Sequence, residues 1–508
     1  MSVTHRTGEV RTALASGARP ASAPVFVHDI LDSARDRSPD AVSVRDARGA
    51  WTYRELADHT VRYAGWLLAR GVGPGDRVLV HAASDRRVVA LLYACSRIGA
   101  ALVPLGTGVP AAQRDEIVSD ARPRLVLGDE TALPPLDGEP SGDEAATPAT
   151  GPQAGVPADA LVPALVVYTS GSTARPKGIV CPHRQVVFAA CAIAERLRYR
   201  ADDVVFCRLP LSFDYGLYQA LLAALATAEL VLAGPGDDAG LLAALRRRNA
   251  TVVPLVPSLA SLLVKLAARD RRPTRVRLFT NTGEALPPPT IEGLRERFPG
   301  AGVQLMFGTS ECKRVTIADV DADRLRPGSL GVPLRGTEVE VLDESGARIP
   351  AGSAGEIVVS GPHVMAGYWD APELTARVFR RDPHSGELRL HTGDFGHLDA
   401  DGHLYFHGRR DHVFKHNGTR TSVTEIEAAA LTVPGVTAAA VVPPTGGRGA
   451  LLYAVVTSGS PAGVLRELHE RIDPLKVPAL CRVVRELPLG PSGKIDRTAL
   501  RLLAGGDV

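Results

Sequence analysis

Several features are scarce in this sequence, and each shortage excludes a class of protein. The 508 residues carry a net charge of only +2, whereas a dedicated nucleic-acid-binding protein usually has a basic stripe, so we predict no nucleic-acid partner. The six cysteines form no CxxC pair, which favours reduced thiols over disulfides or a zinc site. The longest apolar run, residues 220–233, is interrupted by Glu229 and is too short to span a bilayer.

The N-terminal segment lacks the apolar core of about 7–15 residues that marks a secretory signal peptide. Residues 1–20 read MSVTHRTGEVRTALASGARP. We predict a cytoplasmic protein with no membrane partner, and we expect a monomer. The apolar share of 45% and the charged share of 22% are typical of an ordinary globular protein.

Lysine is also scarce, since only six of the 58 basic residues are lysines and the rest are arginines. The two differ where a site needs a compact, reorientable ammonium rather than a planar guanidinium. The remaining lysines are therefore candidates for function, and four of them lie in motif-like contexts. They are Lys177, Lys265, Lys313, Lys415, Lys476 and Lys494.

The pattern of apolar segments predicts an α/β fold. From residue 161 onward, short apolar strands alternate with helical segments, which indicates a large body of mostly parallel sheets with helices. Residues 328–408 change to short strands with turns at DESG and DADG, which predicts an antiparallel β subdomain.

Two domains are expected. Residues 1–408 form the N-terminal core, in which residues 131–160, rich in Pro, Gly and Ala, are expected to be a flexible loop. After residue 409 an αβ pattern resumes for about 100 residues. We predict a small mobile α+β domain over 409–508, with a hinge at 409–411.

The segment 168–178 (YTSGSTARPKG) follows an apolar strand and is rich in hydroxyls and glycine. Such a donor-rich loop can wrap a polyphosphate. Its spacing differs from GxxxxGK[ST], so it is not a P-loop. Taken alone, it is also compatible with a Ser/Thr-rich surface turn.

This loop resembles the phosphate-binding signature of the AMP-forming adenylating enzymes, which comprise acyl- and aryl-CoA synthetases, peptide-synthetase adenylation domains and luciferases. Further motifs resemble those of the family and follow in its order. They are NTGEAL (281–286), FGTSE (307–311), GPHVMAGYW (361–369), HTGD (391–394), GRRD (408–411) and PSGK (491–494). The resemblance covers about residues 25–505 and implies an ATP- and Mg²⁺-dependent acid–thiol ligase.

The resemblance also implies residue roles. Lys494 would bridge the substrate carboxylate and the α-phosphate, Glu311 would hold Mg²⁺, and Lys177 would bind the outer phosphates. Asp411 would be the hinge about which the C-terminal domain rotates after adenylation. The residues implied around ATP or AMP are Thr169, Ser170, Gly171, Ser172, Thr173, Lys177, Gly283, Glu284, Phe307, Gly308, Ser310, Asp394, Arg409 and Arg420. Asp394 could instead form an Asx turn, and Arg409 could be a surface residue.

Asp214 bears on the kind of acid that is activated. The pair Phe213–Asp214 resembles amino-acid adenylation domains, whose aspartate pairs with the substrate ammonium. A carboxylate in a partly buried site is costly unless a cation pairs with it, so such a residue selects amines. The alternative is a helix N-cap, because a helical pattern follows Asp214.

Lys313 and Arg314 follow Glu311 closely, and by the family pattern Arg314 and Val315 line the acyl site. A guanidinium there can bind a carboxylate bidentately. The alternative is that one or both basic side chains point to solvent or brace Glu311. The other residues that the motif positions place at the substrate are Tyr215, Gly216, Tyr218, Thr280, Thr282 and Met306. Gly216 could admit a branched substrate or could simply begin a helix.

Asp214 for an ammonium and Lys313 with Arg314 for a carboxylate together imply an amino acid with two carboxylates. The combination resembles the stand-alone β-amino-acid adenylating enzymes of macrolactam polyketide pathways, which activate aspartate or 3-methylaspartate. No carrier motif is found before Val508, so we expect a separate carrier protein with phosphopantetheine as the thiol acceptor, with coenzyme A as the second choice. The alternatives are an acyl- or aryl-CoA synthetase and a catalytically silent binding protein.

Overall fold

The computed structural model describes most of the chain. The described residues are 24–128, 133, 160–169, 176–234, 236, 238–382, 385–409, 413–416, 419–444, 449–490 and 495–505. Most of the predicted loop 131–160, the residues Ser170–Thr173, the hinge residue Asp411 and Lys494 lie outside them. The side chains of Lys415 and Arg420 are likewise not described.

The body contains two mostly parallel sheets, as predicted. The nine-stranded sheet has the order β14-β13-β12-β11-β10-β8-β9-β1-β2. Its strands are β1 (Val42–Asp46), β2 (Gly49–Thr52), β8 (Val204–Cys207), β9 (Glu229–Leu232), β10 (Val252–Leu255), β11 (Leu278–Asn281), β12 (Gly302–Phe307), β13 (Thr316–Ile317) and β14 (Val332–Pro333). The second sheet has the order β5-β3-β4-β6-β7. Its strands are β3 (Arg77–His81), β4 (Ala101–Leu105), β5 (Leu125–Gly128), β6 (Pro163–Thr169) and β7 (Lys177–Pro182).

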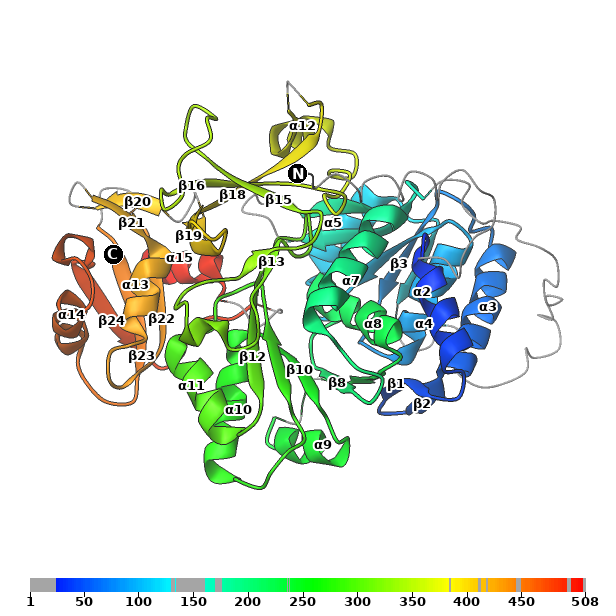
Figure 1. Ribbon diagram of the computed structural model, residues 1–508, viewed down its shortest axis with the longest axis horizontal. Coiled ribbons are helices and arrows are strands. Elements are labelled where there is room, and N and C mark those ends of the chain that lie inside the picture. Colours follow the sequence, from blue (N-terminus) through cyan, green and yellow to red (C-terminus); the bar gives the residue numbers. More distant parts are fainter. Residues whose placement is uncertain are drawn as a thin grey trace, which may run out of the picture.

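Helices pack against both sheets, and one apolar core contains residues of both sheets and of these helices. α7 and α8 lie between the sheets, with α7 against β6 and β7 and α8 against β8 and β9 (Figure 1). The helices of the body are α2 (Val27–Arg37), α3 (Tyr53–Ala69), α4 (Arg86–Arg97), α5 (Ala111–Ala121), α7 (His183–Leu197), α8 (Asp214–Ala226), α9 (Leu241–Arg247), α10 (Pro257–Arg269), α11 (Pro288–Arg297) and α12 (Pro372–Val378). Among the described helices, none is both long and apolar enough to cross a membrane.

The start of α3 illustrates how local sequence sets an element. The Thr52 hydroxyl accepts a hydrogen bond from Glu55 N at 3.2 Å, and Thr52 N donates to the Glu55 carboxylate at 2.7 Å. This reciprocal capping box satisfies two backbone donors that the first helical turn would otherwise leave unpaired.

The predicted antiparallel β subdomain is present. Its strands are β15 (Glu338–Leu342), β16 (Gly355–Ser360), β17 (Phe379–Arg381), β18 (Leu388–Leu398) and β19 (Leu404–Arg409), and all of their pairings are antiparallel. Beyond it lie β20 (Val413–His416), β21 (Thr419–Ser422), α13 (Val423–Ala430), β22 (Val436–Val442), β23 (Leu451–Val456), α14 (Pro461–His469), β24 (Leu480–Val484) and α15 (Arg497–Gly505), coloured orange to red in Figure 1. The strands β22, β23 and β24 form a separate three-stranded sheet with its own apolar clusters.

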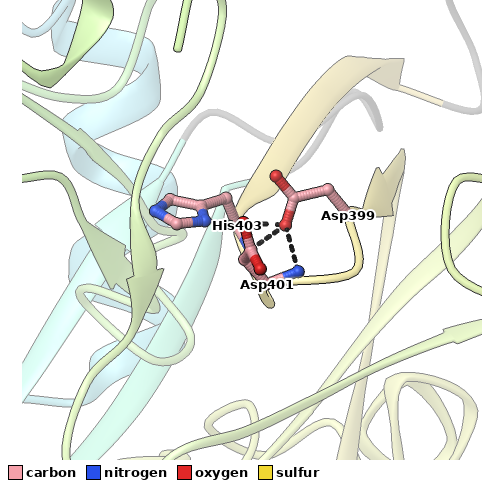
Figure 2. Close-up of side chains that lie close together, drawn as sticks. All are labelled: Asp399, Asp401 and His403. Atoms are coloured by element: carbon pink, nitrogen blue, oxygen red, sulfur yellow. Dashed lines mark hydrogen bonds and ion pairs between the residues drawn. The ribbon is translucent and has the colours of Figure 1, made fainter. Parts of the chain in front are cut away.

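The DADG sequence forms the turn between β18 and β19, as predicted. Figure 2 shows Asp399, Asp401 and His403 gathered there. The Asp399 carboxylate accepts hydrogen bonds from Asp401 N at 3.0 Å and from His403 N at 2.8 Å. Arg326 pairs with Asp399 at 3.3 Å and with Asp401 at 2.7 Å. These contacts compensate the acidic groups, so the cluster braces a tight turn.

Candidate active site

The β6–β7 hairpin carries two of the predicted phosphate-binding residues. The strands are antiparallel, and Thr169 at the end of β6 pairs with Lys177 at the start of β7. The intervening Ser170–Thr173 lie outside the described residues. The pairing holds the two ends of the loop one strand spacing apart, as a loop that wraps an anion requires.

Tyr368 lies between Lys177 and Glu311. Lys177 Nζ is 5.9 Å from the centroid of the Tyr368 ring, and the Tyr368 hydroxyl donates to Glu311 Oε1 at 2.8 Å. Burial and the Glu311 carboxylate raise the pKa of Tyr368 well above its ordinary value, so the hydroxyl remains a donor. Sequence reasoning predicted roles for Lys177 and Glu311 but missed Tyr368, although it belongs to the quoted motif GPHVMAGYW.

Backbone hydrogen bonds of the segment 365–369 fix this arrangement. Trp369 N donates to Gly178 O at 2.6 Å, beside the start of β7. At the other end of the segment, Met365 N donates to Glu311 O at 2.9 Å. The lysine that follows the phosphate loop and the carboxylate predicted to bind Mg²⁺ are therefore positioned by one short segment.

The turn after β12 requires a glycine and holds a lysine in an uncommon conformation. A Cβ atom at Gly308 would lie 2.0 Å from Lys313 O, so no other residue fits there without a shift of the backbone. Lys313 has φ of +66°, and its backbone N donates to Thr309 O at 2.6 Å. Its ammonium Nζ donates to Ser310 O at 2.9 Å. The turn thus fixes both ends of the lysine.

Asp394 on β18 is a buried carboxylate with little compensation. It is 5% exposed, and among its contacts in the described part of the chain the carboxylate pairs only with Arg409, whose Nε lies 3.7 Å away. Burial raises the pKa of Asp394 to about 7, with Arg409 opposing and Glu311 and Glu356 adding to the rise. Its oxygens remain able to accept hydrogen bonds, as the predicted role toward two ribose hydroxyls requires.

The predicted adenine loop follows β11 directly. Gly283 has φ of +85°, a conformation that favours glycine. Burial lowers the pKa of Arg497 on α15, but Glu427 and then Glu284 more than offset this effect, so the pKa is raised.

Asp214 opens α8 but is not its N-cap. The N-cap is Phe213, and Asp214 is the first helical residue. The Asp214 carboxylate is 5% exposed and forms an ion pair with Lys313 Nζ at 3.8 Å. The alternative of a capping aspartate is therefore wrong.

Lys313 and Arg314 are both buried, with 1% and 5% of their surface exposed. The alternative that they point to solvent is therefore excluded. Burial alone would lower the pKa of Lys313, but the Cys181 sulfur and the Asp214 carboxylate raise it above its ordinary value, so the side chain stays charged. Arg314 Nη1 donates to Lys313 O at 2.7 Å, and its guanidinium carbon lies 4.8 Å from the Tyr215 ring centroid.

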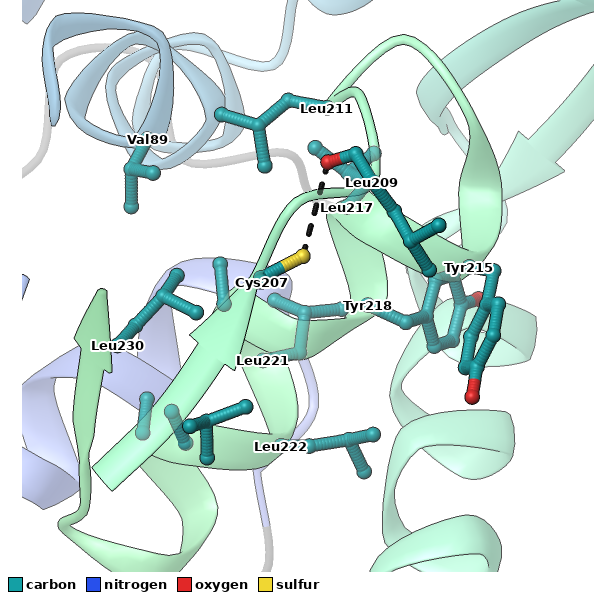
Figure 3. Close-up of a cluster of buried hydrophobic side chains, with 14 of the residues drawn as sticks. Val89, Cys207, Leu209, Leu211, Tyr215, Leu217, Tyr218, Leu221, Leu222 and Leu230 are labelled. Atoms are coloured by element: carbon teal, nitrogen blue, oxygen red, sulfur yellow. Dashed lines mark hydrogen bonds between the residues drawn. The ribbon is translucent and has the colours of Figure 1, made fainter. Parts of the chain in front are cut away.

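Several polar atoms of the predicted substrate residues have no partner within the described part of the chain. They include Arg314 Nε, the Tyr218 hydroxyl and the Thr282 hydroxyl, all of them buried. The Tyr215 hydroxyl, by contrast, hydrogen-bonds with Thr280 Oγ1 at 2.7 Å. Figure 3 shows Tyr215 and Tyr218 at the edge of the apolar core formed around β8 and α8. Because buried polar atoms are normally paired, the free ones are suited to a ligand.

The remaining predicted residues lie around this cluster with packing roles. A Cβ at Gly216 would lie 2.3 Å from Pro210 O, so this close approach alone accounts for the glycine. Met306 belongs to the main apolar core, whereas Phe307 and Val315 belong to the cluster beneath the antiparallel sheet. Direct substrate contact by these residues stays a prediction.

Sequence reasoning also missed Cys181 on β7, a buried thiol. Burial raises the pKa of Cys181, and the Lys313 ammonium opposes that rise. No local signal could have revealed this link, because the two residues come from different sheets and motifs.

Comparison with known proteins supplies the family. Residues 31–369 match the model of the AMP-binding enzymes, and residues 425–494 match that of the AMP-binding enzyme C-terminal domain. CymA of Salinispora arenicola, described as a nonribosomal peptide synthetase, is 35% identical over 97% of this chain. Enterobactin synthase component F of Escherichia coli is 31% identical over 92%. The chain spans only 6% and 38% of these two proteins, respectively.

Solved structures agree with the family match. VinN in complex with L-aspartate is 43% identical, with a TM-score of 0.67, over 75% of this chain and 98% of that one. ATP-bound MatB from Rhodopseudomonas palustris is 27% identical, with a TM-score of 0.82, over 94% of this chain and 99% of that one. With the ordered motifs and the geometry above, these matches establish that the chain belongs to the AMP-binding enzyme family and is an AMP-forming ligase.

Proposed function

We propose that this ligase adenylates the β-carboxyl of aspartate or 3-methylaspartate and then transfers the aminoacyl group to the phosphopantetheine thiol of a separate carrier protein. The observation that carries the proposal is the buried cluster of Asp214, Lys313 and Arg314. This cluster contains one anionic side chain, Asp214, and two cationic ones, Lys313 and Arg314. A substrate head group with one ammonium and one carboxylate matches it in charge.

The ion pair between Asp214 and Lys313 is loose, which favours an exchange of partners. Asp214 and Lys313 are 3.8 Å apart, which is longer than a charge-assisted hydrogen bond of about 2.8 Å. A substrate ammonium beside Asp214 and a carboxylate beside Lys313 would replace one loose ion pair by two close ones. Arg314 keeps an unpaired Nε for the same carboxylate.

This arrangement supports the β-carboxyl as the group that reacts. In aspartate the ammonium and the α-carboxylate share one carbon, so adjacent opposite charges in the protein would hold both. The β-carboxylate is then the group left to meet ATP. It is already ionised near neutral pH, so it needs positioning and charge neutralisation rather than a general base.

The nucleotide half of the site would supply that neutralisation. The second oxygen of Glu311 suits Mg²⁺, a hard cation that prefers carboxylate ligands and would neutralise the departing pyrophosphate. Lys177 and the hydroxyls of the preceding loop would bind the outer phosphates, and Asp394 would bind the ribose. Lys494 would stabilise charge at the α-phosphate, and rotation about Asp411 would then withdraw it and admit the carrier thiol.

Two structures of one neighbour support the choice of substrate. VinN has been solved with L-aspartate and with 3-methylaspartate, at 43% and 39% identity to this chain. The similarity to peptide synthetases supports an amino acid as substrate and a carrier as acceptor. The o-succinylbenzoate CoA synthetase of Bacillus subtilis, solved with its acyl-adenylate intermediate, is 25% identical with a TM-score of 0.79 over 93% of this chain, which makes a coenzyme A ligase the second candidate.

The test is acid-dependent ATP–pyrophosphate exchange. The panel holds aspartate, 3-methylaspartate, glutamate, β-alanine, 3-aminobutanoate, proline and several fatty and aryl acids. We expect exchange with the aspartates alone, lost in Arg314→Ala. Exchange with monocarboxylic amino acids would retain Asp214 and remove the role of Arg314, and exchange with fatty or aryl acids alone would favour the coenzyme A ligase.

A further variant separates an enzyme from a silent binding protein. Lys494→Ala should still bind ATP but lose adenylation, because the lysine acts only in the reaction. Unchanged exchange in this variant would contradict the catalytic role of Lys494.

A further inference from the structure

The strand β18 contains an irregularity that ends at Asp394. Where β18 pairs with β16, one residue of β16, Ile357, faces the three residues 392–394 of β18. The regular pairs on either side are Glu356–Phe395 and Val358–His391. A regular antiparallel ladder pairs residues one to one, so β18 bulges here. Bulges are frequent beside active sites, where they redirect a side chain.

The backbone of this bulge needs partners that the sheet cannot supply. Gly393, at its centre, has φ of +69°, a conformation that favours glycine. Residues of a bulge lose hydrogen bonds of the ladder, and a buried backbone group without a partner is costly. The conformation of residues 392–394 therefore depends on side chains that bind their N–H groups and the facing carbonyl.

Two side chains bind these backbone groups. The Thr392 hydroxyl donates to Ile357 O at 2.7 Å and accepts from Asp394 N at 3.0 Å. Gly393 N donates to Glu356 Oε1 at 3.2 Å. The bulge is thus held by Glu356 from β16 and by Thr392 from β18 itself.

The Glu356 carboxylate is held in turn by His391. His391 Nδ1 lies 3.3 Å from Glu356 Oε2, so each oxygen of the carboxylate has a partner. Burial alone would raise the pKa of Glu356, but His391 and then Gly393 N lower it below its ordinary value. The group is therefore ionised near neutral pH, and its hydrogen bond to Gly393 N is charge-assisted.

Asp394 is the residue whose place this bulge determines. It is the last residue of the bulge, and its backbone N is one of the groups that Thr392 binds. To accept hydrogen bonds from both hydroxyls of a ribose, its carboxylate must lie at the right distance and angle from each. A small shift of the backbone would weaken both bonds, because hydrogen bonds weaken steeply as they become misaligned.

We propose that Glu356 and Thr392 are positioning residues for the nucleotide, because they hold the bulge 392–394 in the conformation that presents Asp394 to the two ribose hydroxyls. The inference rests on the ribose-binding role proposed for Asp394 and adds two residues to that part of the site. Both residues act through Asp394. Their loss therefore weakens recognition of the ribose hydroxyls and leaves the other contacts of the nucleotide in place.

Glu340 on the neighbouring strand β15 provides a matched control. It lies opposite Val358 of β16, and its side chain is 8% exposed, against 19% for Glu356. Its carboxylate pairs with Arg348 and, at 3.2 Å, with Arg389. Both glutamates belong to one sheet and both are paired, but within the described residues the bulge accepts its carboxylate bond from Glu356 alone.

The experiment compares binding of ATP and of 2′,3′-dideoxy-ATP to the full chain by isothermal titration calorimetry. Dideoxy-ATP lacks both ribose hydroxyls, so the ratio of the two Kd values reports recognition of these hydroxyls. The measurement is made at pH 8, above the pKa of Asp394 of about 7. We expect a ratio of about 30 for the wild type, about 3 for Glu356→Ala and about 1 for Asp394→Ala.

Conservative variants separate positioning from folding. Glu356→Gln keeps an acceptor oxygen for Gly393 N and should keep the ratio above about 10. Thr392→Val removes the hydroxyl at nearly the same shape and should lower the ratio to about 3, whereas Thr392→Ser should behave like the wild type. Glu340→Ala should lower the melting temperature and leave the ratio unchanged.

The sign of the expected effect distinguishes positioning from a change of charge. The Glu356 carboxylate raises the pKa of Asp394. Its removal by itself would therefore favour the ionised form of Asp394, which is the better hydrogen-bond acceptor. A loss of discrimination in Glu356→Ala consequently reports a displaced Asp394.

Several results would overturn the inference. They are an unchanged ratio in Glu356→Ala or Thr392→Val, an equal fall in Glu340→Ala, and no recovery in Glu356→Gln. If Asp394→Ala discriminates as the wild type does, or the wild type does not discriminate, the proposed role of Asp394 fails and this inference fails with it. If Asp394→Ala loses discrimination while Glu356→Ala and Thr392→Val keep it, only the positioning role fails. Thr392→Val decides the question if Glu356→Ala does not fold.

Discussion

Asp214 and Asp394 are equally buried, each 5% exposed, yet they differ in how their charge is balanced. Asp214 pairs with the ammonium of Lys313, which is itself 1% exposed. Asp394 pairs with Arg409, whose side chain is 52% exposed at a similar distance of 3.7 Å. A buried cation compensates a buried anion more strongly than one that water also solvates, because screening by water is weak in the interior.

The difference follows the ligands proposed for the two places. The Asp214–Lys313 pair is charge-balanced before a zwitterionic head group arrives, so substrate binding exchanges the partners of these two charges. Asp394 awaits a neutral diol, which donates hydrogen bonds but brings no charge. The pKa of Asp394 is raised to about 7 because its carboxylate is buried without a charged ligand to compensate it.

Removing the buried cation should have the largest effect. Lys313→Met leaves Asp214 buried without compensation, which we expect to destabilise the fold by about 3–5 kcal/mol and to abolish aspartate-dependent exchange. Chemical denaturation at neutral pH measures the first and the exchange assay the second. The double variant Asp214→Asn with Lys313→Met should regain most of the stability but none of the exchange. Wild-type stability in the single variant would show that the pair is not needed for folding.

The opposite result is expected at the ribose position. In the unfolded chain Asp394 has its ordinary pKa of about 4, whereas in the folded chain its pKa is about 7. Between these two pH values the folded chain therefore binds a proton that the unfolded chain does not. Wild-type stability should therefore fall as pH rises from 4 to 7 and then level off. Asp394→Asn should be more stable than wild type by about 2–4 kcal/mol at pH 8, with little difference at pH 4.

The same variant should bind nucleotide less tightly, because an amide offers one acceptor oxygen where the carboxylate offers two. Urea denaturation at the two pH values gives the stability difference, and the KM for ATP reports the function. A stability gain that is the same at both pH values would contradict an origin in the titration of Asp394.

A moderate effect is expected at Tyr215, which supports Arg314. Tyr215→Phe removes the hydrogen bond to Thr280 but keeps the ring beneath the Arg314 guanidinium. We therefore expect the free energy of unfolding to fall by about 1 kcal/mol and the KM for aspartate to rise slightly. Tyr215→Leu also removes the ring and should raise that KM further. Equal values for the two variants would show that stacking on Tyr215 does not position Arg314.

The smallest effect should come from Arg409, the solvated partner. Arg409→Gln removes a cation that lowers the pKa of Asp394, so the pH at which wild-type stability levels off should move upward. The stability change itself should stay below about 1 kcal/mol because the side chain is half exposed. A loss as large as that of Lys313→Met would remove the distinction between the two regions.

The fold was predictable where local signals agree with tertiary structure. The alternation of strands and helices after residue 161 and the capping box of Thr52 and Glu55 depend on residues close in sequence. The resemblance assigned Asp214, Lys313 and Arg314 to one substrate site, and the structure brings the first two into an ion pair, whereas their role toward a substrate stays a prediction. The ion pair between the first two also matches their opposite charges.

Other features could not be predicted because they arise from contacts between distant segments. β7 and the turn after β12 come together only because both are hydrogen-bonded to the segment 365–369. Gly216 had two explanations in the sequence, and only the position of Pro210 O favours packing. The low exposure of Asp394 depends on strands that pair across the antiparallel sheet, which no short motif encodes.

The close approach of Gly308 to Lys313 O has a consequence for engineering new substrate preference. Because backbone atoms meet there, the backbone of the turn restricts its length, whereas exchange of Lys313 affects stability through the charge of Asp214. Libraries that exchange Lys313 and Arg314 as a two-residue cassette should therefore retain folded members where the charge of Asp214 stays compensated, whereas insertions or deletions between positions 308 and 313 should yield none. Evolution of this segment faces the same constraint, so new specificities would arise there by substitution alone.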